Sequence, residues 1–270
     1  MIQGIHTIRK KIKEHKSLIH CITNPISINQ CANAILAVGA RPIMAEHPKE
    51  VKEITESASA LMLNLGNITD ARMASIQISA QTAKENHIPV LLDAVGVACS
   101  KLRRDYVRDL LRTAMPTVIK GNYSEINALY HEDYYASGVE ADAVLDERAL
   151  DQVAVELARA YHTVILASGK VDIVTDGTRL VHIKNGTPQL SGITGTGCML
   201  GALAAAYLAI QPDMNAAITA CVMLGICGQL AETDRGSGSF MMNLMDALST
   251  VKSADIKRLM DMEEIEIEEL

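Results

Sequence analysis

Tryptophan is absent from this 270-residue sequence, and phenylalanine occurs once, as Phe240. Aromatic residues make up only 3% of the chain, so stacking platforms for nucleic-acid bases cannot be built on any scale. Hydrophobic residues nevertheless reach 49%, which excludes a disordered chain. The core must therefore be aliphatic, filled by alanine, leucine, isoleucine, valine and the 13 methionines.

An excess of positive charge is also missing. The net charge is −7 and the isoelectric point is about 5.6, so no global basic surface is available for a polyanion. The most apolar stretches, 199–210 and 216–228, are each shorter than the roughly 20 residues that span a bilayer. Both stretches predict buried helices, and neither a nucleic acid nor a membrane is expected as a partner.

The six cysteines are dispersed and form no C-x-x-C pair, which argues against a zinc site or a disulfide framework. The N-terminus lacks the apolar run of a signal peptide. We therefore expect reduced thiols in a cytoplasmic protein. Near the N-terminus, Ile5, Ile8 and Ile12 recur at helical spacing beneath a basic face. This pattern favours a helix docked on the same domain over a targeting helix.

Strand-like and helix-like segments alternate through the first two thirds of the chain. Strands are predicted at 18–23, 41–45, 60–66, 88–96, 117–122 and 163–169, and helices at 27–39, 47–58, 69–86, 101–114, 123–130 and 146–161. Ser27 and Gly39 are expected to bound the first of these helices, and Pro48 to lie near the first turn of the second. Such alternation predicts right-handed crossovers and a largely parallel sheet. The nearly continuous apolar strands indicate a sheet covered on both faces.

The last third of the chain departs from this alternation. An Asp-Gly pair divides the β-rich segment 172–183, which predicts a hairpin and hence an antiparallel extension at one edge of the sheet. From residue 196 onward almost everything reads as helix. Residues 255–270 are expected to be an acidic, frayed C-terminal tail of a single domain that spans residues 1–270.

The stretch GITGTGCMLGAL at 192–203 places glycines directly before a predicted helix. A helix N-terminus presents free N–H groups and about half a positive charge. Gly195, Thr196, Gly197 and Cys198 are therefore predicted to cradle a phosphate in transfer. The stretch is not a P-loop, because no lysine follows, and it lacks the spacing of a dinucleotide-binding fingerprint. A turn that only lets the helix pack closely is the alternative interpretation.

In parallel α/β sheets, ligands bind beyond the carboxyl ends of the strands. Polar residues follow or end several predicted strands here, namely Asn24, Asp93, Lys120, Asn122 and Ser168. Asp93, Asn122 and Glu125 offer oxygen ligands for Mg²⁺, directly or through water. The alternative interpretation is local: Asp93 caps a turn, while Asn122 and Glu125 cap a helix.

Cys198 stands at the threshold of the predicted helix, where a general base could act. Phosphoryl transfer needs an acceptor hydroxyl placed in line, help in removing its proton, and a metal that bridges the nucleotide phosphates. A helix N-terminus favours the thiolate form of a cysteine, which is the form that can accept a proton.

Several ordered motifs together resemble the hydroxyethylthiazole kinase family of the ribokinase-like superfamily. They are ITNPISINQCANAILAVGARPIMA (22–45), NLGN (64–67), PVLLDAVGV (89–97), PTVIKGNYSEI (116–126) and ITGTGCMLGAL (193–203). The resemblance extends to about residue 250. It implies a ribokinase-like three-layer α/β/α fold with a mostly parallel central sheet and an antiparallel edge hairpin.

The resemblance implies ATP-dependent phosphorylation of 4-methyl-5-(2-hydroxyethyl)thiazole with Mg²⁺, a thiamine salvage step, in a homotrimer whose active sites lie between subunits. It also implies a role for each matching position. Asn24, the backbone near Met44, and Gly195 would contact the thiazole. Lys120 and Ser168, with Asn122 beside them, would contact ATP. Asp93 and Glu125 would lie by the magnesium, and residues 195–198 would form the anion hole and the catalytic segment.

Two positions depart from the wider pattern. Across the superfamily the residue at the position of Cys198 is commonly an aspartate that acts as general base, although thiazole kinases accept cysteine there. A thiol is a poorer base than a fixed carboxylate, so positioning and electrostatics would carry most of the catalysis. Lys120 stands where the family has arginine, and lysine cannot form a bidentate fork with phosphate.

Three other functions remain open on the sequence. The first is the same phosphoryl transfer to another alcohol, such as hydroxymethylpyrimidine or a sugar. The second is a lyase of the same fold that acts on a nucleotide hydrate, for which an aspartate is expected at position 198. The third is a non-catalytic protein that binds thiazole or nucleotide, in which Cys198 marks a lost activity.

Overall fold

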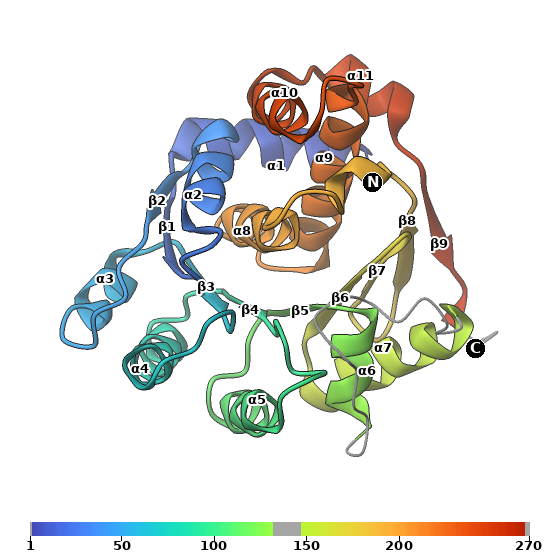
Figure 1. Cartoon of the computed structure of the whole chain (residues 1–270). Coiled ribbons are helices and arrows are strands. Elements are labelled where there is room, and N and C mark those ends of the chain that lie inside the picture. The colour runs from blue at the N-terminus through green and yellow to red at the C-terminus, as the bar shows by residue number, and fades with distance from the viewer. Residues whose placement is uncertain (1, 132–146, 268–270) are drawn as a thin grey trace.

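The computed structural model describes residues 2–131 and 147–267. Their nine strands form one sheet in the order β2-β1-β3-β4-β5-β6-β7-β8-β9 (Figure 1). The strands are β1 (Leu18–Ile22), β2 (Arg41–Ile43), β3 (Ala60–Asn64), β4 (Val90–Asp93), β5 (Val118–Asn122), β6 (Val164–Ser168), β7 (Asp172–Thr175), β8 (Leu180–Ile183) and β9 (Met262–Ile265).

Strands β1 to β6 run parallel to one another, and β7, β8 and β9 each pair antiparallel with the strands beside them. The parallel part follows from the helices that separate its strands, since each crossover returns the chain to the same end of the sheet. The predicted Asp-Gly turn joins β7 to β8. The expected mostly parallel sheet with an antiparallel edge is confirmed.

Helices cover both faces of the sheet, which makes three layers (Figure 1). On one face lie α3 (Val51–Ser57), α4 (Asp70–Glu85), α5 (Lys101–Thr113), α6 (Tyr123–Tyr130) and α7 (Glu147–Tyr161). On the other lie α1 (Ile2–His15), α2 (Ile28–Ala37), α8 (Thr196–Leu208), α9 (Met214–Ala231), α10 (Ser237–Thr250) and α11 (Ser253–Leu259). Each face has its own aliphatic core. The described residues all belong to this layered unit; that residues 1–270 form a single domain stays a prediction.

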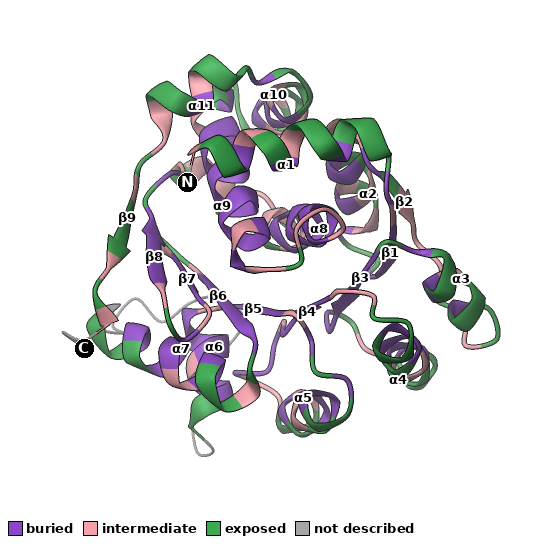
Figure 2. Ribbon diagram, turned by 180° about the vertical axis from the view of Figure 1, so that it is seen from behind, coloured by how far each residue is buried: buried purple, intermediate pink, exposed green. Residues whose placement is uncertain are grey.

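Helices α8 and α9 are buried on nearly all sides (Figure 2). They lie between the sheet and an outer cover that includes α1, α2 and α10. Among the described helices, α9 alone is long and apolar enough to cross a membrane, with a mean hydropathy of 1.6, but 83% of it is buried in the structure. The prediction of two buried core helices is therefore confirmed.

Helix α1 docks on this same core. Ile5, Ile8 and Ile12 are buried beneath it, as the helical spacing predicted. The guanidinium of Arg9 adds a 2.7 Å hydrogen bond to the carbonyl oxygen of Val251. The docking-helix interpretation is therefore confirmed.

The acidic C-terminal segment is not frayed as expected. Residues 253–259 form α11, and β9 pairs antiparallel with β8. Composition misled the prediction because the carboxylates of β9 face cations: Glu264 pairs with Arg179 and Glu263 with Lys184, both at 2.7 Å. Residues 268–270 lie outside the described residues.

Two expected helix signals also differ from the structure. Pro48 lies in a turn before α3, which begins at Val51. Ser27 occupies the N-cap position of α2, but its hydroxyl caps no backbone N–H and is buried without a partner. Gly39 does follow the end of α2 with a φ of +97°, as its predicted role as a stop requires.

Candidate active site

Buried polar side chains meet at the carboxyl edge of the sheet. Asn24 follows β1, Asn64 ends β3, Asp93 ends β4, and Lys120 lies in β5. Cys198 lies in the first turn of α8, above the same edge. Because the strands are parallel, all their carboxyl ends lie on one side of the molecule, as the sequence predicted.

A chain of hydrogen bonds crosses these strands. The Asn24 side-chain amide donates to Asn64 Oδ1 at 3.1 Å, and the Asn64 amide donates to Asp93 Oδ2 at 2.9 Å. Asp93 Oδ1 accepts from Lys120 Nζ at 3.1 Å. The cluster is therefore a connected polar network in a surrounding of aliphatic side chains.

The sulfur of Cys198 lies over two amide donors. Asn24 Nδ2 is 3.3 Å and Asn64 Nδ2 is 3.4 Å from Sγ. Backbone donors fix which end of each amide faces the sulfur, because Ser27 N donates to Asn24 Oδ1 and Gly66 N to Asn64 Oδ1. The sulfur thus receives one N–H donor from each of the two amides.

The N-terminus of α8 is open to an anion. Gly195, at the N-cap position, has a φ of +94°, and no side chain caps the helix there. Met199 N is bonded to Gly195 O, so the N–H groups of the three residues before it point out of the helix end. A Cβ on Gly197 would lie 3.4 Å from Lys120 Nζ, which places the ammonium beside these N–H groups.

A glycine also sets how closely α8 approaches the strands. A Cβ added at Gly201 would lie 3.0 Å from Met62 Cε, 3.3 Å from a Leu91 methyl and 3.4 Å from Asp93 Oδ2. The helix therefore packs so closely on β3 and β4 that a side chain at this position would need its neighbours to give by a few tenths of an ångström. The packing-turn interpretation of the glycines holds for Gly201, whereas Gly195 and Gly197 face the open end.

Asp93 and Lys120 form a buried ion pair. Burial alone would lower the pKa of Lys120, but the neighbouring Asp93 and Glu125 carboxylates outweigh it and hold that pKa above its ordinary value. Burial raises the pKa of Asp93, while Lys120 and Asn64 oppose that rise. These two tendencies disagree about the charge of the pair. The 3.1 Å contact and the extra Asn64 donor favour the ionised form at neutral pH.

Glu125 is held mainly by backbone groups. Its carboxylate accepts from Gly96 N and Asn122 N, both at 2.7 Å, and Asn122 in turn accepts from Glu125 N at 2.8 Å. The last two bonds form a capping box at the start of α6, so the local interpretation of this pair is correct. Burial raises the pKa of Glu125, and Lys120 partly offsets it.

A complete metal site is not formed by side chains alone. Over residues 2–131 and 147–267, no three His, Cys, Asp or Glu side chains are grouped so that they could hold a metal ion. Asp93 and Glu125 each keep carboxylate lone pairs. Magnesium usually takes one or two carboxylates and completes its shell with water and substrate phosphates, so these two residues fit it.

The remaining predicted residues lie at the same edge but make no hydrogen bond to Cys198 in the structure. Ser168 ends β6, and its hydroxyl donates to Gly121 O at 3.3 Å. Met44 follows β2 and packs against the core on the α2 side. The next residue, Ala45, has its carbonyl oxygen 2.9 Å from a ring nitrogen of the buried His20.

Sequence reasoning missed the role of Asn64. It closes the otherwise apolar strand ALMLN, much as Asp93 closes VLLD, so the same signal was present in both. Sequence reasoning also missed Arg72, a buried arginine in the first turn of α4. A cation at a helix N-terminus opposes the helix dipole, and that misfit was the available signal.

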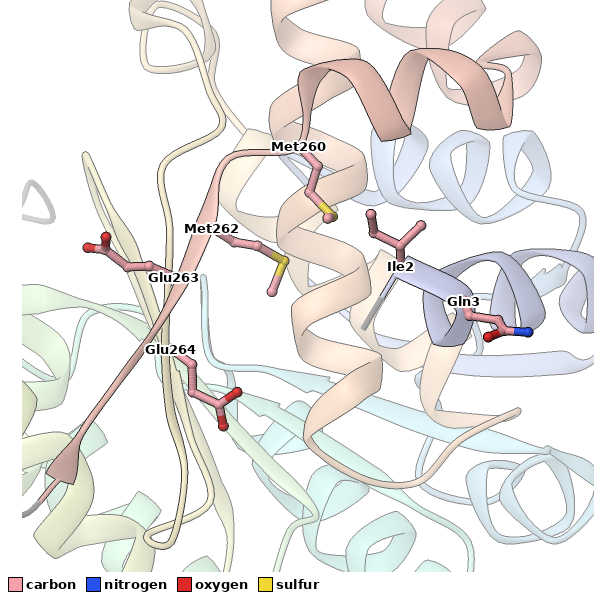
Figure 3. A pocket seen from close by; sticks show the side chains of 6 residues that line it. All are labelled: Ile2, Gln3, Met260, Met262, Glu263 and Glu264. Carbon is pink, nitrogen blue, oxygen red and sulfur yellow. The ribbon is translucent and has the colours of Figure 1, made fainter.

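A cavity of about 440 Å³ lies elsewhere, between the start of α1 and the segment that leads into β9 (Figure 3). Its lining residues are Ile2, Gln3, Met260, Met262, Glu263 and Glu264. None of them belongs to the polar cluster. The cluster is the better candidate site, because it combines an open helix N-terminus, buried charges and a donor-bound thiol.

Known proteins resemble this chain in both sequence and fold. A family model described as the hydroxyethylthiazole kinase family matches residues 9–254. Hydroxyethylthiazole kinase 2 of Clostridium botulinum is 47% identical over 249 residues, which cover 90% of this chain and 94% of the relative. Hydroxyethylthiazole kinase of Finegoldia magna is 39% identical, with 98% of each chain covered.

A solved structure of a hydroxyethylthiazole kinase protein from Pyrococcus horikoshii OT3 superposes with a TM-score of 0.90 at 32% identity. The match covers 98% of this chain and 100% of that one. A ribokinase-like superfamily protein from Enterococcus faecalis V583 has a TM-score of 0.66 at 14% identity, covering 92% and 89% of the two chains, which supports the fold alone.

Proposed function

Since the chain belongs to the hydroxyethylthiazole kinase family, we propose that the cluster at the carboxyl edge of its sheet is where this kinase transfers phosphate to a hydroxyl group. The acceptor is 4-methyl-5-(2-hydroxyethyl)thiazole, and the step belongs to thiamine salvage. The observation that carries the assignment of the site is the meeting of the open α8 N-terminus with Lys120 and the donor-bound Cys198.

The phosphoryl group in transfer lies at the N-terminus of α8. The N–H groups of Thr196, Gly197 and Cys198 point out of the helix end, where they stabilise the charge on the transferring oxygens. The ammonium of Lys120 adds a full positive charge beside them. These donors are already oriented toward the developing negative charge. In water, solvent molecules would have to reorient to stabilise the same charge.

Cys198 receives the proton of the acceptor hydroxyl. Its sulfur is held by the amides of Asn24 and Asn64. As the hydroxyl oxygen attacks the γ-phosphorus of ATP, its proton moves to Sγ in the thiolate form, the bond from that phosphorus to the bridging oxygen breaks, and ADP leaves. The thiazole ring contacts Asn24, the backbone near Met44, and Gly195. Asn24 follows β1, Met44 follows β2, and Gly195 directly precedes α8.

ATP and Mg²⁺ occupy the β4–β6 side of the cluster. Kinase chemistry uses ATP as co-substrate, and the metal ion neutralises charge on its phosphates. Asp93 and Glu125 hold the ion, in part through water, because their oxygens already accept hydrogen bonds. Lys120, Asn122 and Ser168 lie along the nucleotide.

The working enzyme is a cytoplasmic homotrimer in which neighbouring subunits complete each site. Two exposed apolar side chains support an interface here: Ile26 is 57% exposed in the loop after β1, and Leu36 is 55% exposed on α2. Ile26→Glu is expected to dissociate the assembly and lower turnover, as measured by light scattering and kinetics. A fully active monomer would contradict this assignment.

The direct test of the reaction is ADP release from Mg·ATP with a panel of alcohols. Hydroxyethylthiazole, hydroxymethylpyrimidine and ribose are compared with a control without acceptor. We expect turnover with the thiazole and only background with the others. Preferred turnover of another alcohol would show that this alcohol, and not the thiazole, is the substrate. Thiazole binding without any turnover would show a non-catalytic protein.

The proton-accepting role of Cys198 has its own test. Cys198→Ala is expected to lower kcat by about 10²-fold or more, the contribution of a positioned base. Cys198→Asp should keep or raise kcat, because a carboxylate can take the same proton. If Cys198→Asp falls to the level of Cys198→Ala, the residue at this position is not a base.

A further inference from the structure

The guanidinium of Arg72 is buried on the acceptor side of the cluster. It lies in the first turn of α4, and the residue is only 5% exposed. Nε and Nη2 donate to Glu46 Oε2 at 2.8 and 2.7 Å, and Nη2 also donates to the carbonyl oxygen of Thr23. Nη1 donates to the carbonyl oxygens of Gly66 and Asn67 at 3.3 and 3.1 Å. All five N–H donors of the arginine fork are therefore in use.

These acceptors belong to three different loops. Thr23 lies in the loop after β1, Glu46 in the loop after β2, and Gly66 and Asn67 in the loop after β3. A second residue of α4 strengthens the middle contact, because the hydroxyl of Ser75 donates to the backbone oxygen of Glu46 at 2.8 Å. The N-terminal turns of α4 thus join the carboxyl-end loops of three adjacent strands, which lie side by side in Figure 1.

Each of these loops leads directly to the acceptor side of the proposed site. Thr23 precedes Asn24, and Glu46 is two residues beyond Met44. Gly66 packs so closely on Asn24 that an added Cβ would lie 2.8 Å from Asn24 Nδ2 and 2.9 Å from Asn64 Oδ1. A shift of the loop after β1 or of the loop after β3 would therefore displace the amides that hold the Cys198 sulfur, and a shift of the loop after β2 would displace the backbone near Met44.

The stability of α4 does not account for this arginine. A cation in the first turn opposes the helix dipole, and a buried charge paired with a half-exposed carboxylate is expensive to desolvate. Thr69 already caps the helix by accepting from the backbone N–H of Arg72. The guanidinium instead supplies hydrogen-bond donors to the carbonyl oxygens of Thr23, Gly66 and Asn67 in two of these loops.

We propose that Arg72 is a positioning residue that fixes the three acceptor-binding loops relative to one another, and so sets thiazole affinity without acting on the nucleotide. The inference rests on the proposed function for the identity of the acceptor. Within residues 2–131 and 147–267, Arg72 donates to no residue after β4, β5 or β6, where the proposed nucleotide and metal residues lie. Lysine cannot replace it, because one ammonium with three donors cannot reach three loops at once.

The experiment compares wild type, Arg72→Lys and Arg72→Ala. The matched control is Arg9→Gln, which removes a guanidinium–carbonyl bond far from the cluster, between α1 and Val251. In both Arg72 variants, KM for hydroxyethylthiazole should rise about 10- to 100-fold, while KM for ATP changes less than about twofold. Millimolar guanidinium chloride, compared with sodium chloride, should restore part of the thiazole affinity of Arg72→Ala. Arg9→Gln should change neither KM.

A parallel rise of both KM values, or the same losses in Arg9→Gln, would overturn the proposal and leave Arg72 a purely structural residue. Amide hydrogen exchange separates this failure from a failure of the proposed function. Faster exchange confined to residues 23–27, 44–50 and 65–69 in Arg72→Ala supports the role in positioning even if the wild type turns over no thiazole. Unchanged exchange in these loops contradicts it even if the wild type is fully active.

Discussion

At the ends of β1 and β3 the side chains that contact the Cys198 sulfur are neutral amides, whereas at β4 and β5 the site is held by a buried ion pair. On the first side, the Asn24 amide donates to Asn64 Oδ1, and both amides donate to the Cys198 sulfur. Asp93 and Lys120 form a buried ion pair on the second. Asn64 joins the two sides, because one of its hydrogens goes to Asp93.

The two sides should respond to different disturbances. A neutral hydrogen bond contributes only about 0.5–1.5 kcal/mol, but it has strict distance and angle requirements. A buried ion pair that loses one partner costs about 3–5 kcal/mol, and the cost depends on pH. The amides around the Cys198 sulfur should therefore be sensitive to geometry, and the Asp93–Lys120 pair to charge.

The largest effect is expected where both sides meet the phosphate. Gly197→Val places a branched side chain at the open end of α8, next to Lys120 Nζ. Turnover should fall by about 10³-fold, since the oxyanion donors are obstructed. Gly197 is exposed, so the melting temperature should barely change. Gly197→Ala is the control, because its Cβ makes only an ordinary 3.4 Å contact with Lys120 Nζ, and we expect a smaller loss of turnover. Normal turnover in the valine variant would show that Gly197 belongs to a turn that only lets the helix pack closely.

Removing the cation should break the charged side alone. Lys120→Met leaves Asp93 buried without its partner and should cost about 3–5 kcal/mol of unfolding free energy at neutral pH, measured by urea denaturation. Without Lys120 the folded-state pKa of Asp93 rises further. The variant should then be least impaired below the ordinary carboxyl pKa, and lose stability as pH rises through that raised pKa. Lys120→Arg keeps the charge and should lose less. An equal cost at pH 5 and pH 8 would contradict the ion-pair account.

Substituting Asn24 and Asn64 one at a time distinguishes the amides around the Cys198 sulfur from the Asp93–Lys120 pair. Asn64→Leu should lower kcat/KM by about 10- to 100-fold, because it frees both Asp93 and Cys198 from a positioned donor. It should also move the acid limb of the pH–rate profile upward, since Asn64 helps to hold the pKa of Asp93 down against the effect of burial. Asn24→Leu is the matched variant, because Asn24 donates to Cys198 but not to Asp93. An identical upward shift of the acid limb in both variants would refute the division.

The smallest expected effect lies at the rim of the charged side. Burial raises the pKa of Asp172 to about 6, although Gly169 N donates to its carboxylate. Its protonated form is favoured in the folded state, so the stability it contributes is complete below its ordinary pKa and is lost as pH rises through about 6. Asp172→Asn should therefore gain up to about 1 kcal/mol at pH 8, reduced by solvent at this partly exposed residue, and nothing near pH 4. Melting curves at the two pH values test the sign.

Much of the fold could be predicted because its signals are local. Apolar runs marked the strands, and the predicted 123–130 helix matches α6 residue for residue. Asp93 and Lys120 could also be identified as candidates, because each is a charged residue at or near the end of an otherwise apolar strand, where ligands bind in parallel sheets. The charged side of the site was therefore visible in the sequence.

The neutral side was harder to predict because it depends on contacts between distant segments. Asn64 and Cys198 are 134 positions apart, and only the folded chain brings the amide to the sulfur. Arg72 bonds carbonyl oxygens, which every residue has, so nothing in the sequence marks its partners. The strand β9 was hidden by acidic composition, since pairing with Arg179 and Lys184 requires the sheet to exist first.

Gly201 lies within α8, beyond its open N-terminus, and its lack of a side chain sets how closely the helix lies over Asp93. An added methyl group would press on Met62, on Leu91 and on the Asp93 carboxylate, each of which would have to give by a few tenths of an ångström. A change inside the core would thereby reach the proposed site through Asp93, with every proposed substrate contact left in place.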